Sequence, residues 1–512
     1  MKIRSGICLS SAMALTLGLT AGAARADEAT LQAQIRNLSA QLQALQAQVN
    51  AEAAAAAAAK TAAAAAAKTT AAAAQTTAAA TPAEAPNGKS FITEGSFPGS
   101  FLIPSTNTSV RLGGYVKADV IYEPDAGNGG VTTQFGSIPL PGTAAAKRDG
   151  EVNVTARQTR LSVQTRTPTG DGETLRTYVE GDFYGQDGNK LSTNSTVLRL
   201  RQAYGVWNGL LIGQTYSNFE DHDAGIESVE FNNSIGRANG IRQAMVQYQH
   251  TLGPGLLSVA LESPDGDFQG ADQPALNSGA NTISTNILDK APDFTAAYIY
   301  RGAWGHVQVM GVARELSVDT GGIASANSTV PGGAKIKGRG DAFGGGGGAS
   351  VLLNTNSTDG KDNYFTAEFS AGDGIGRYIQ GVDSGRQAGY FDNATQTLHT
   401  EAAYGFAVAY RNWWSSTLRT NVIYGHTHAS NFSAMDTSDL ATNPNKDLDN
   451  VYVNLIWSPV PQTNFGLEYV LGHRVADGPS STKAAVTGAA AGSTVKNEAW
   501  GNRLQFGAQY LF

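Results

Sequence analysis

Arginine and lysine are frequent in several short alternating segments between residues 110 and 202. In Leu198-Arg199-Leu200-Arg201, for example, apolar and basic side chains take turns. A guanidinium group binds a carboxylate through two parallel hydrogen bonds and stays charged at any working pH. Arg157 and Arg242 lie near these segments, although alternation does not fix which way they face. In extended segments, alternation predicts one basic face that could bind anions weakly, formed by Lys117, Arg160, Arg166, Arg176, Arg199 and Arg201.

A structural role for the same arginines is the alternative. Glu173, Glu180 and Asp182 belong to one neighbouring segment and could pair with them. In that case the basic residues would hold the structure together and would not bind a solute. Both readings place the charges on a polar, inward face, because charge facing lipid would cost about 2–4 kcal/mol per residue.

Other chemical motifs are weak. His426-Thr427-His428 could ligate a metal, but no third ligand is in view, and we expect a solvated strand end and no metal site. No Ser/His/Asp spacing, P-loop or HExxH motif is present. The single cysteine, Cys8, lies in the N-terminal apolar stretch, so disulfides and thiol chemistry are not expected. The sequence therefore predicts no enzyme and no cofactor.

Composition narrows the class further. The chain has 512 residues, 60 of them glycine, and only 41% are hydrophobic. A helical membrane protein would carry several apolar stretches of about 20 residues, and only the N-terminus comes near one. The net charge of −7 argues against nucleic acid as a partner.

Residues 89–512 alternate in pieces of about ten residues bounded by turn residues, which is typical of transmembrane strands. In Val116–Tyr122, one face is apolar and the other carries Lys117 and Asp119. Long connections alternate with short turns. We predict an all-β transmembrane β-barrel of about 16 antiparallel strands, beginning near Ser109, Asn153, Glu173, Ser195, Gly209, Ala238, Gly255, Lys290, Ala303, Gly338, Lys361, Thr400, Ser415, Asp447, Pro461 and Ala499.

Tryptophan placement agrees with a barrel. Five tryptophans fall at predicted short turns and a sixth begins the last strand, as in an interfacial girdle: Trp207, Trp304, Trp413, Trp414, Trp457 and Trp500.

The third long connection, Ser217–Arg237, is rich in acids. In a barrel of this size it has the position of an infolding constriction loop, and acids facing an arginine ladder would set up a field across the lumen. The alternative is an acidic, solvated outer loop. The candidate constriction residues are Glu220, Asp221, Asp223, Glu227 and Glu230.

Three segments precede the barrel. Residues 1–26 are typical of a secretory signal, with Lys2 and Arg4 before an apolar stretch and Ala24-Arg25-Ala26 as a cleavage site; an uncleaved anchor is the alternative. Residues 27–50 carry a heptad seam that predicts an α-helical coiled coil, with a helix docked on the barrel as the alternative. Residues 51–88 are an alanine-rich periplasmic spacer, ended by prolines.

The last strand alternates up to a terminal aromatic residue. Gln505, Gly507, Tyr510 and Phe512 fill the places of the C-terminal signal that the outer-membrane barrel-assembly machinery reads, and the segment resembles that signal. With an export signal and an alternating barrel, the match predicts assembly into the outer membrane.

The mature chain resembles the DcaP-like outer-membrane porins. The resemblance is carried by the segments Gly99–Ser109, Val110–Lys117, Leu198–Gly205 and Leu210–Thr215. It implies a homotrimer of 16-stranded barrels in the outer membrane that takes up small anions, with dicarboxylates as the substrate class.

Three functions remain open at this point. The leading one is a passive diffusion porin for small hydrophilic solutes. A phosphate-selective porin is the alternative within the channel class. From another class, the barrel could be a structural anchor or adhesin whose N-terminal segment binds peptidoglycan; eight to ten strands around a closed lumen would favour it.

Overall fold

The computed structural model describes residues 93–125, 130–185, 194–238, 240–270, 287–319, 339–383, 387–392, 397–431, 440, 443–483, 486, 488–490 and 492–512. The predicted signal peptide, coiled coil and alanine-rich spacer lie outside the described residues. Within the described ranges, regular structure consists of strands and short 3₁₀ turns. In the same part of the chain, no helix is long and apolar enough to span a membrane.

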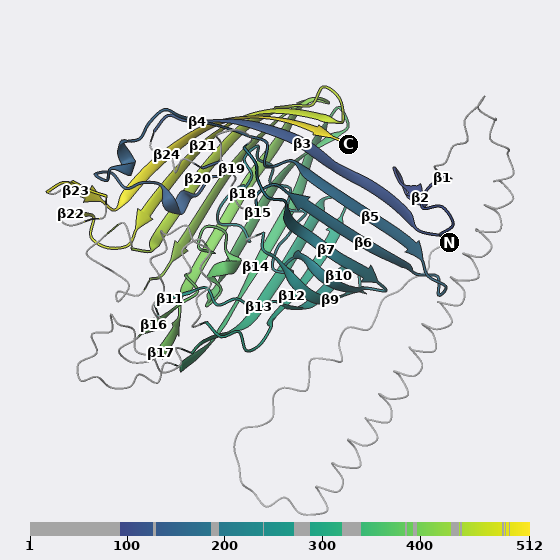
Figure 1. The fold of residues 1–512 in the computed structure, drawn as a ribbon, viewed down its shortest axis with the longest axis horizontal. Helices are drawn as coiled ribbons and strands as arrows, with labels where there is room; N and C mark the ends of the chain where they lie inside the picture. The colour runs from purple at the N-terminus through teal and green to yellow at the C-terminus, as the bar shows by residue number, and fades with distance from the viewer. Residues whose placement is uncertain are drawn as a thin grey trace, which may run out of the picture. The chain divides into compact units, whose positions relative to one another are not determined.

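The strands close into a 16-stranded antiparallel β-barrel (Figure 1). Closure is made by the first and last strands, where Gln505 pairs with Ile121 and Phe506 with Val120. β4 (Glu151–Thr155) pairs with the far half of the first strand and precedes the second strand. The barrel strands are β3 (Ser109–Glu123), β5 (Arg160–Pro168), β6 (Thr174–Asp182), β7 (Arg199–Trp207), β8 (Leu210–Tyr216), β9 (Arg242–Leu252), β10 (Gly255–Glu262), β12 (Asp293–Gly302), β13 (Gly305–Asp319), β14 (Arg339–Thr358), β15 (Lys361–Asp373), β18 (Ala402–Ser415), β19 (Leu418–Ala429), β20 (Asn445–Trp457), β21 (Thr463–Ala476) and β24 (Glu498–Leu511).

The predicted strand count and order are confirmed. Each predicted start lies within a few residues of an observed strand, and most of the differences fall where a polar connection runs into the strand. For example, β9 begins at Arg242, whereas alternation alone predicted a start near Ala238. Long connections gather at one end of the barrel and short turns at the other, as the sequence predicted.

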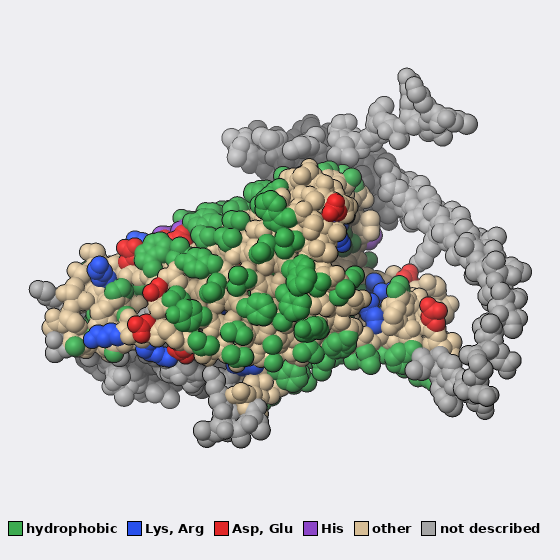
Figure 2. Space-filling model, turned by 90° about the horizontal axis from the view of Figure 1, so that it is seen from above, with side chains coloured by type: hydrophobic (Ala, Val, Ile, Leu, Met, Phe, Trp, Pro, Cys, Tyr) green, Lys and Arg blue, Asp and Glu red, His purple; other side chains and the backbone are tan. Residues whose placement is uncertain are grey.

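Each strand sorts its side chains by face. In β3, Val116, Val120 and Tyr122 are exposed on the outer wall, whereas Lys117 and Asp119 are buried inside. Backbone polar groups inside a bilayer must pair with one another, which a closed sheet achieves, and the outer wall must be apolar. Figure 2 shows apolar side chains covering the middle of one outer face, with charged side chains gathered towards its ends.

The tryptophans follow the predicted girdle with one exception. Trp207, Trp304, Trp414, Trp457 and Trp500 are exposed on the outer wall, between 40% and 63%. Trp413 faces the other way and packs under Arg419, with the guanidinium carbon 4.9 Å from the ring centroid. It shares the inner face with Arg411, two residues earlier, so strand parity sends it inwards.

The remaining described strands are short. β1 (Thr93–Glu94) and β2 (Phe101–Leu102) form a hairpin that pairs with the start of β3. β11 (Phe268–Gly270), β16 (Gly389–Asp392) and β17 (Thr397–Thr400) form a small sheet, and β22 (Ser481–Lys483) pairs with β23 (Thr494–Lys496). β1 and β2 precede the first barrel strand, and the other five belong to the connections between barrel strands.

Candidate functional site: the barrel lumen

The connection between β8 and β9, residues 217–241, passes through the barrel. Its backbone contacts β3 through a hydrogen bond from Lys117 Nζ to the carbonyl of Val229 (2.5 Å). It contacts β21 where the amides of Val229 and Glu230 donate to Glu468 (2.9 and 2.8 Å), and β15 where the Tyr364 hydroxyl donates to Gly225. Since one segment touches walls far apart around a closed barrel, it must lie in the lumen.

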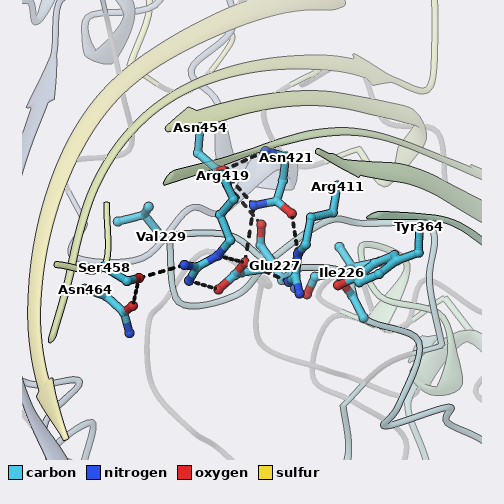
Figure 3. Close-up of polar contacts among 12 residues, drawn as sticks. Ile226, Glu227, Val229, Tyr364, Arg411, Arg419, Asn421, Asn454, Ser458 and Asn464 are labelled. Atoms are coloured by element: carbon cyan, nitrogen blue, oxygen red, sulfur yellow. Dashed lines mark hydrogen bonds and ion pairs between the residues drawn. The ribbon is translucent and has the colours of Figure 1, made fainter. Parts of the chain in front are cut away.

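Glu227 is the best-anchored acid of this connection. Its carboxylate accepts two hydrogen bonds from Arg419 (2.7 and 2.8 Å) and one from Arg411 (2.7 Å), as Figure 3 shows. The Asn454 side chain donates to its backbone carbonyl (3.0 Å). Burial acts to raise the pKa of Glu227, but the hydrogen bonds and charges of the two arginines hold it below its ordinary value. The connection is thus fixed to β18 and β19 by charge.

The other acids of the connection also have their own partners. Asp221 lies 2.7 Å from Nε2 of His306, and Asp223 pairs with Arg301. The carboxylate of Glu230 accepts backbone amides, among them that of Thr133 (2.7 Å). These carboxylates therefore have partners of their own, although Glu220, Asp221 and Asp223 line one cavity together with Arg160 of the predicted ladder. Their partners come mostly from β12 onwards.

Glu220 lies in a buried cluster with more acid than base. Arg237, from the same connection, is 3.8 Å from Glu220 and 3.4 Å from Glu368. Burial, with the neighbouring charges of Glu368 and Asp221, raises the pKa of Glu220 to about 7 despite the opposing charges of Arg237 and Arg242. This cluster is therefore expected to bind a proton near neutral pH.

The predicted arginine set divides into two groups. In the first, the guanidiniums are neutralised or hydrogen-bonded. Arg199 and Arg201 pair with Asp182 at 2.8 Å, and Arg201 also pairs with Glu180 at 2.7 Å. The contacts of these two arginines match the structural role considered in the sequence analysis, with Glu180 and Asp182 as the acids. Glu173 makes no ion pair with the described residues.

Three further members of the set are held by local contacts. Lys117 pairs with Asp119 (3.1 Å). Arg157 donates to the carbonyls of Phe183 and Gly185 and stacks on Tyr184. Arg242 lies over the ring of Tyr216, at 5.3 Å.

The second group lacks close acids. Arg166 and Arg176 lie directly opposite each other on β5 and β6. Among the described residues, neither has a carboxylate within ion-pair distance, and the Nε of Arg166 is buried without a hydrogen-bond partner. Arg160 is intermediate between the two groups, because it forms an ion pair with Glu180 at 3.7 Å. Arg111, which the sequence analysis missed, joins them from β3, where it donates to Gln164 (2.9 Å).

Aromatic side chains lie on this cationic wall. The guanidinium carbon of Arg166 lies 4.3 Å from the ring centroid of Phe97, and that of Arg111 lies 5.7 Å from the same centroid. A cavity of about 470 Å³ adjoins the wall between the infolded connection and β5–β13. Polar and aromatic side chains line it, among them Arg160, Tyr178 and Arg301, together with the acids Glu180, Glu220, Asp221 and Asp223.

Sequence reasoning missed several basic residues of the later strands. Arg411 and Arg419 hold Glu227, and Arg314 is buried between Asp267 (2.7 Å) and Asp293 (3.4 Å). Strand parity in β13, β18 and β19 would have placed these side chains inside. Their carboxylate partners come from distant parts of the chain, so no local pattern predicts the pairs.

A closed barrel of this size with an infolded third connection defines the class: a transmembrane barrel of the porin type. The sequence profile of the DcaP outer membrane protein family matches residues 100–484, and this chain belongs to that family. Membership places the barrel in the outer membrane.

Two comparisons with known proteins also find an outer membrane channel and a porin. The crystal structure of the outer membrane channel DcaP of Acinetobacter baumannii is similar with a TM-score of 0.60 at 21% identity, covering 80% of this chain and 99% of that one, and supports the fold. Porin Omp2b of Brucella canis is 30% identical over 218 residues, which is 41% of this chain. The chain spans about half the length of that relative, 52%. The comparisons point to a channel and not to an enzyme.

Removing the Glu227 carboxylate should loosen the infolded connection. Glu227→Gln leaves two guanidiniums facing a neutral amide, so we expect a loss of about 1–3 kcal/mol in the free energy of unfolding. Urea unfolding of the reconstituted barrel measures it. The control is Glu151→Gln, which breaks the exposed pair with Arg148 and should cost less than about 1 kcal/mol. Equal effects of the two variants would contradict the anchoring role.

Stability should also depend on pH through Glu220. Its pKa is higher in the folded chain (about 7) than its ordinary 4.5, so its protonation favours the folded state. This contribution is complete below pH 4.5 and is lost as pH rises to about 7. Thermal unfolding across this range should show the decline in the wild type and a smaller one in Glu220→Gln. The same slope in both proteins would rule out Glu220 as the source.

Proposed function

We propose that this protein is a diffusion porin that passes small hydrophilic solutes and prefers anions, dicarboxylates among them, along the wall formed by β3, β5 and β6. The single observation that carries the proposal is the opposed pair Arg166 and Arg176. Like charges directly opposite each other on neighbouring strands are destabilising. A wall that keeps such a pair without an acid is suited to attract a passing anion.

The surrounding charges support a weak, repeated interaction. Arg111 and Arg160 extend the positive surface on one side of the Arg166–Arg176 register, since Arg111 lies opposite Gln164 and Arg160 opposite Tyr115 on β3. Guanidiniums that are solvated on one side bind carboxylates by paired hydrogen bonds without trapping them, as conduction requires. Arg199 and Arg201 contribute less, because Glu180 and Asp182 neutralise them.

The two alternatives differ in what they require of the lumen. A phosphate-selective porin would use the same wall, and stronger block of small-salt current by phosphate than by dicarboxylates would favour it. A purely structural anchor would need only a small barrel with a closed lumen. The 16 strands and the lumen cavity favour a channel instead.

Neutralising the opposed arginines should lower anion preference. In Arg166→Gln/Arg176→Gln, we expect the anion-to-cation permeability ratio to fall roughly two- to fivefold, because each charge acts over a few ångströms through water. The reversal potential across a salt gradient in a planar bilayer measures this ratio. Arg148→Gln, at an exposed ion pair in the connection between β3 and β4, should leave it unchanged. A cation-selective wild type would contradict the proposal.

We further propose that the barrel is a homotrimer, inserted by the barrel-assembly machinery. The outer wall of β3–β8 supports self-association, since its exposed apolar residues are mainly branched aliphatics such as Leu112, Val163, Val179 and Ile212. Exposed aromatic residues gather instead on the wall from β9 to β24. Tyr510 and Phe512 are exposed on the last strand, where a terminal signal would be read. Peptidoglycan binding by the N-terminal segment stays a prediction.

A charge placed on the aliphatic wall should break the trimer. Val179→Arg is expected to shift the purified protein from trimer to monomer, because the residue would be buried between copies, and native mass spectrometry reports the shift. The matched variant Val453→Arg lies on the wall of β20 and should leave the trimer intact. A monomeric wild type, or equal effects of the two variants, would contradict this assignment.

A further inference from the structure

His426 and His428 lie on the outer wall close to the end of β19, which ends at Ala429. Both residues are within the paired ladder, where His426 faces Phe406 and His428 faces Tyr404 of β18. The alternate residues of the strand, such as Thr427, are buried on the inner face. The two imidazoles therefore share one face, with Cα atoms roughly 6.5–7 Å apart as two residues of a strand dictate.

Each imidazole is held by its own carboxylate. Nδ1 of His426 lies 2.9 Å from Asp449, and Nδ1 of His428 lies 2.7 Å from Asp447, both on the neighbouring strand β20. A carboxylate accepts hydrogen bonds, so each Nδ1 carries the proton and donates. In the neutral ring this leaves the lone pair on Nε2. Metal-binding histidines in proteins show the same arrangement.

Aromatic contacts restrain the two rings. The Tyr404 ring centroid is 5.8 Å from that of His426 and 5.3 Å from that of His428. Phe406 lies 5.5 Å from His426 on the same side. Packing and hydrogen bonding together limit the rotation of both imidazoles.

We propose that Nε2 of His426 and Nε2 of His428 bind a first-row divalent transition metal such as Zn²⁺ on the outer surface of the barrel. Imidazole nitrogens bind Zn²⁺ at about 2.0–2.1 Å. Among the residues that the structure describes, no three His, Cys, Asp or Glu side chains converge around a metal position. The site therefore has two protein ligands, with water in the other positions, and exchanges its metal readily.

His473 provides the contrast within the same surface. It shares Asp449 through Nδ1 (3.0 Å), but its Nε2 is also engaged, at 3.1 Å from Glu498. Its ring stacks on Trp500 at 4.2 Å. With both nitrogens occupied, His473 has no lone pair to offer and belongs to a polar belt that only holds the strand ends together.

The test is Zn²⁺ binding by the full chain in detergent, purified without a polyhistidine tag and titrated calorimetrically near pH 7.5. We expect one saturable site in the wild type and none in His426→Gln/His428→Gln. Asp447→Asn, which removes only the support of His428, should weaken binding about 10–100-fold. His473→Gln should bind as the wild type does.

Circular dichroism and heat-modifiable migration in gels check that each variant is a folded barrel. Three results would overturn the proposal: no saturable binding by the wild type, binding that survives in the double variant, or a loss in folded His473→Gln as large as in the double variant. None of these results bears on anion passage, because the site lies on the outer wall.

Discussion

The pairing of every backbone polar group within a closed sheet is the constraint on which this structure depends. Hydrocarbon offers no hydrogen bonds, so β24 must return to β3, and alternation then sends every second side chain into the lumen. Charged residues of distant strands are thereby brought into one polar interior. The outer wall is left apolar except at its ends, where His426, Asp449 and their neighbours lie.

Within that interior, charge is distributed unevenly. The infolded connection is fastened to the later strands through the Glu227 carboxylate, which binds Arg411 and Arg419, and through the amides of Val229 and Glu230, which donate to Glu468. Arg166 and Arg176, on the early strands, keep no acid within ion-pair distance. The early strands therefore keep an opposed pair of positive charges, and the proposed preference for anions rests on this pair.

The alternation of apolar and polar side chains and the positions of turn residues were enough to predict the number and order of the strands and the inward facing of Lys117 and Arg201. These features depend on residues that are neighbours in the sequence. The partners of the constriction acids could not be predicted. Glu227 meets Arg411 and Arg419 nearly two hundred residues away, through a loop whose path depends on the whole barrel. The sequence placed His426 and His428 near a strand end, where they lie, but it did not predict their carboxylate partners Asp449 and Asp447, because these come from β20.

Passage of solutes along the arginine wall can be tested with introduced thiols. The only cysteine of the chain lies in the predicted signal, so a single introduced thiol can be modified selectively. Gln164→Cys places it inside the lumen beside Arg111, and Val163→Cys places it on the outer wall. In planar bilayers, a negatively charged thiol reagent should reduce the current of Gln164→Cys, react with it faster than a positively charged reagent does, and leave Val163→Cys unaffected. An unchanged current in modified Gln164→Cys would contradict the account.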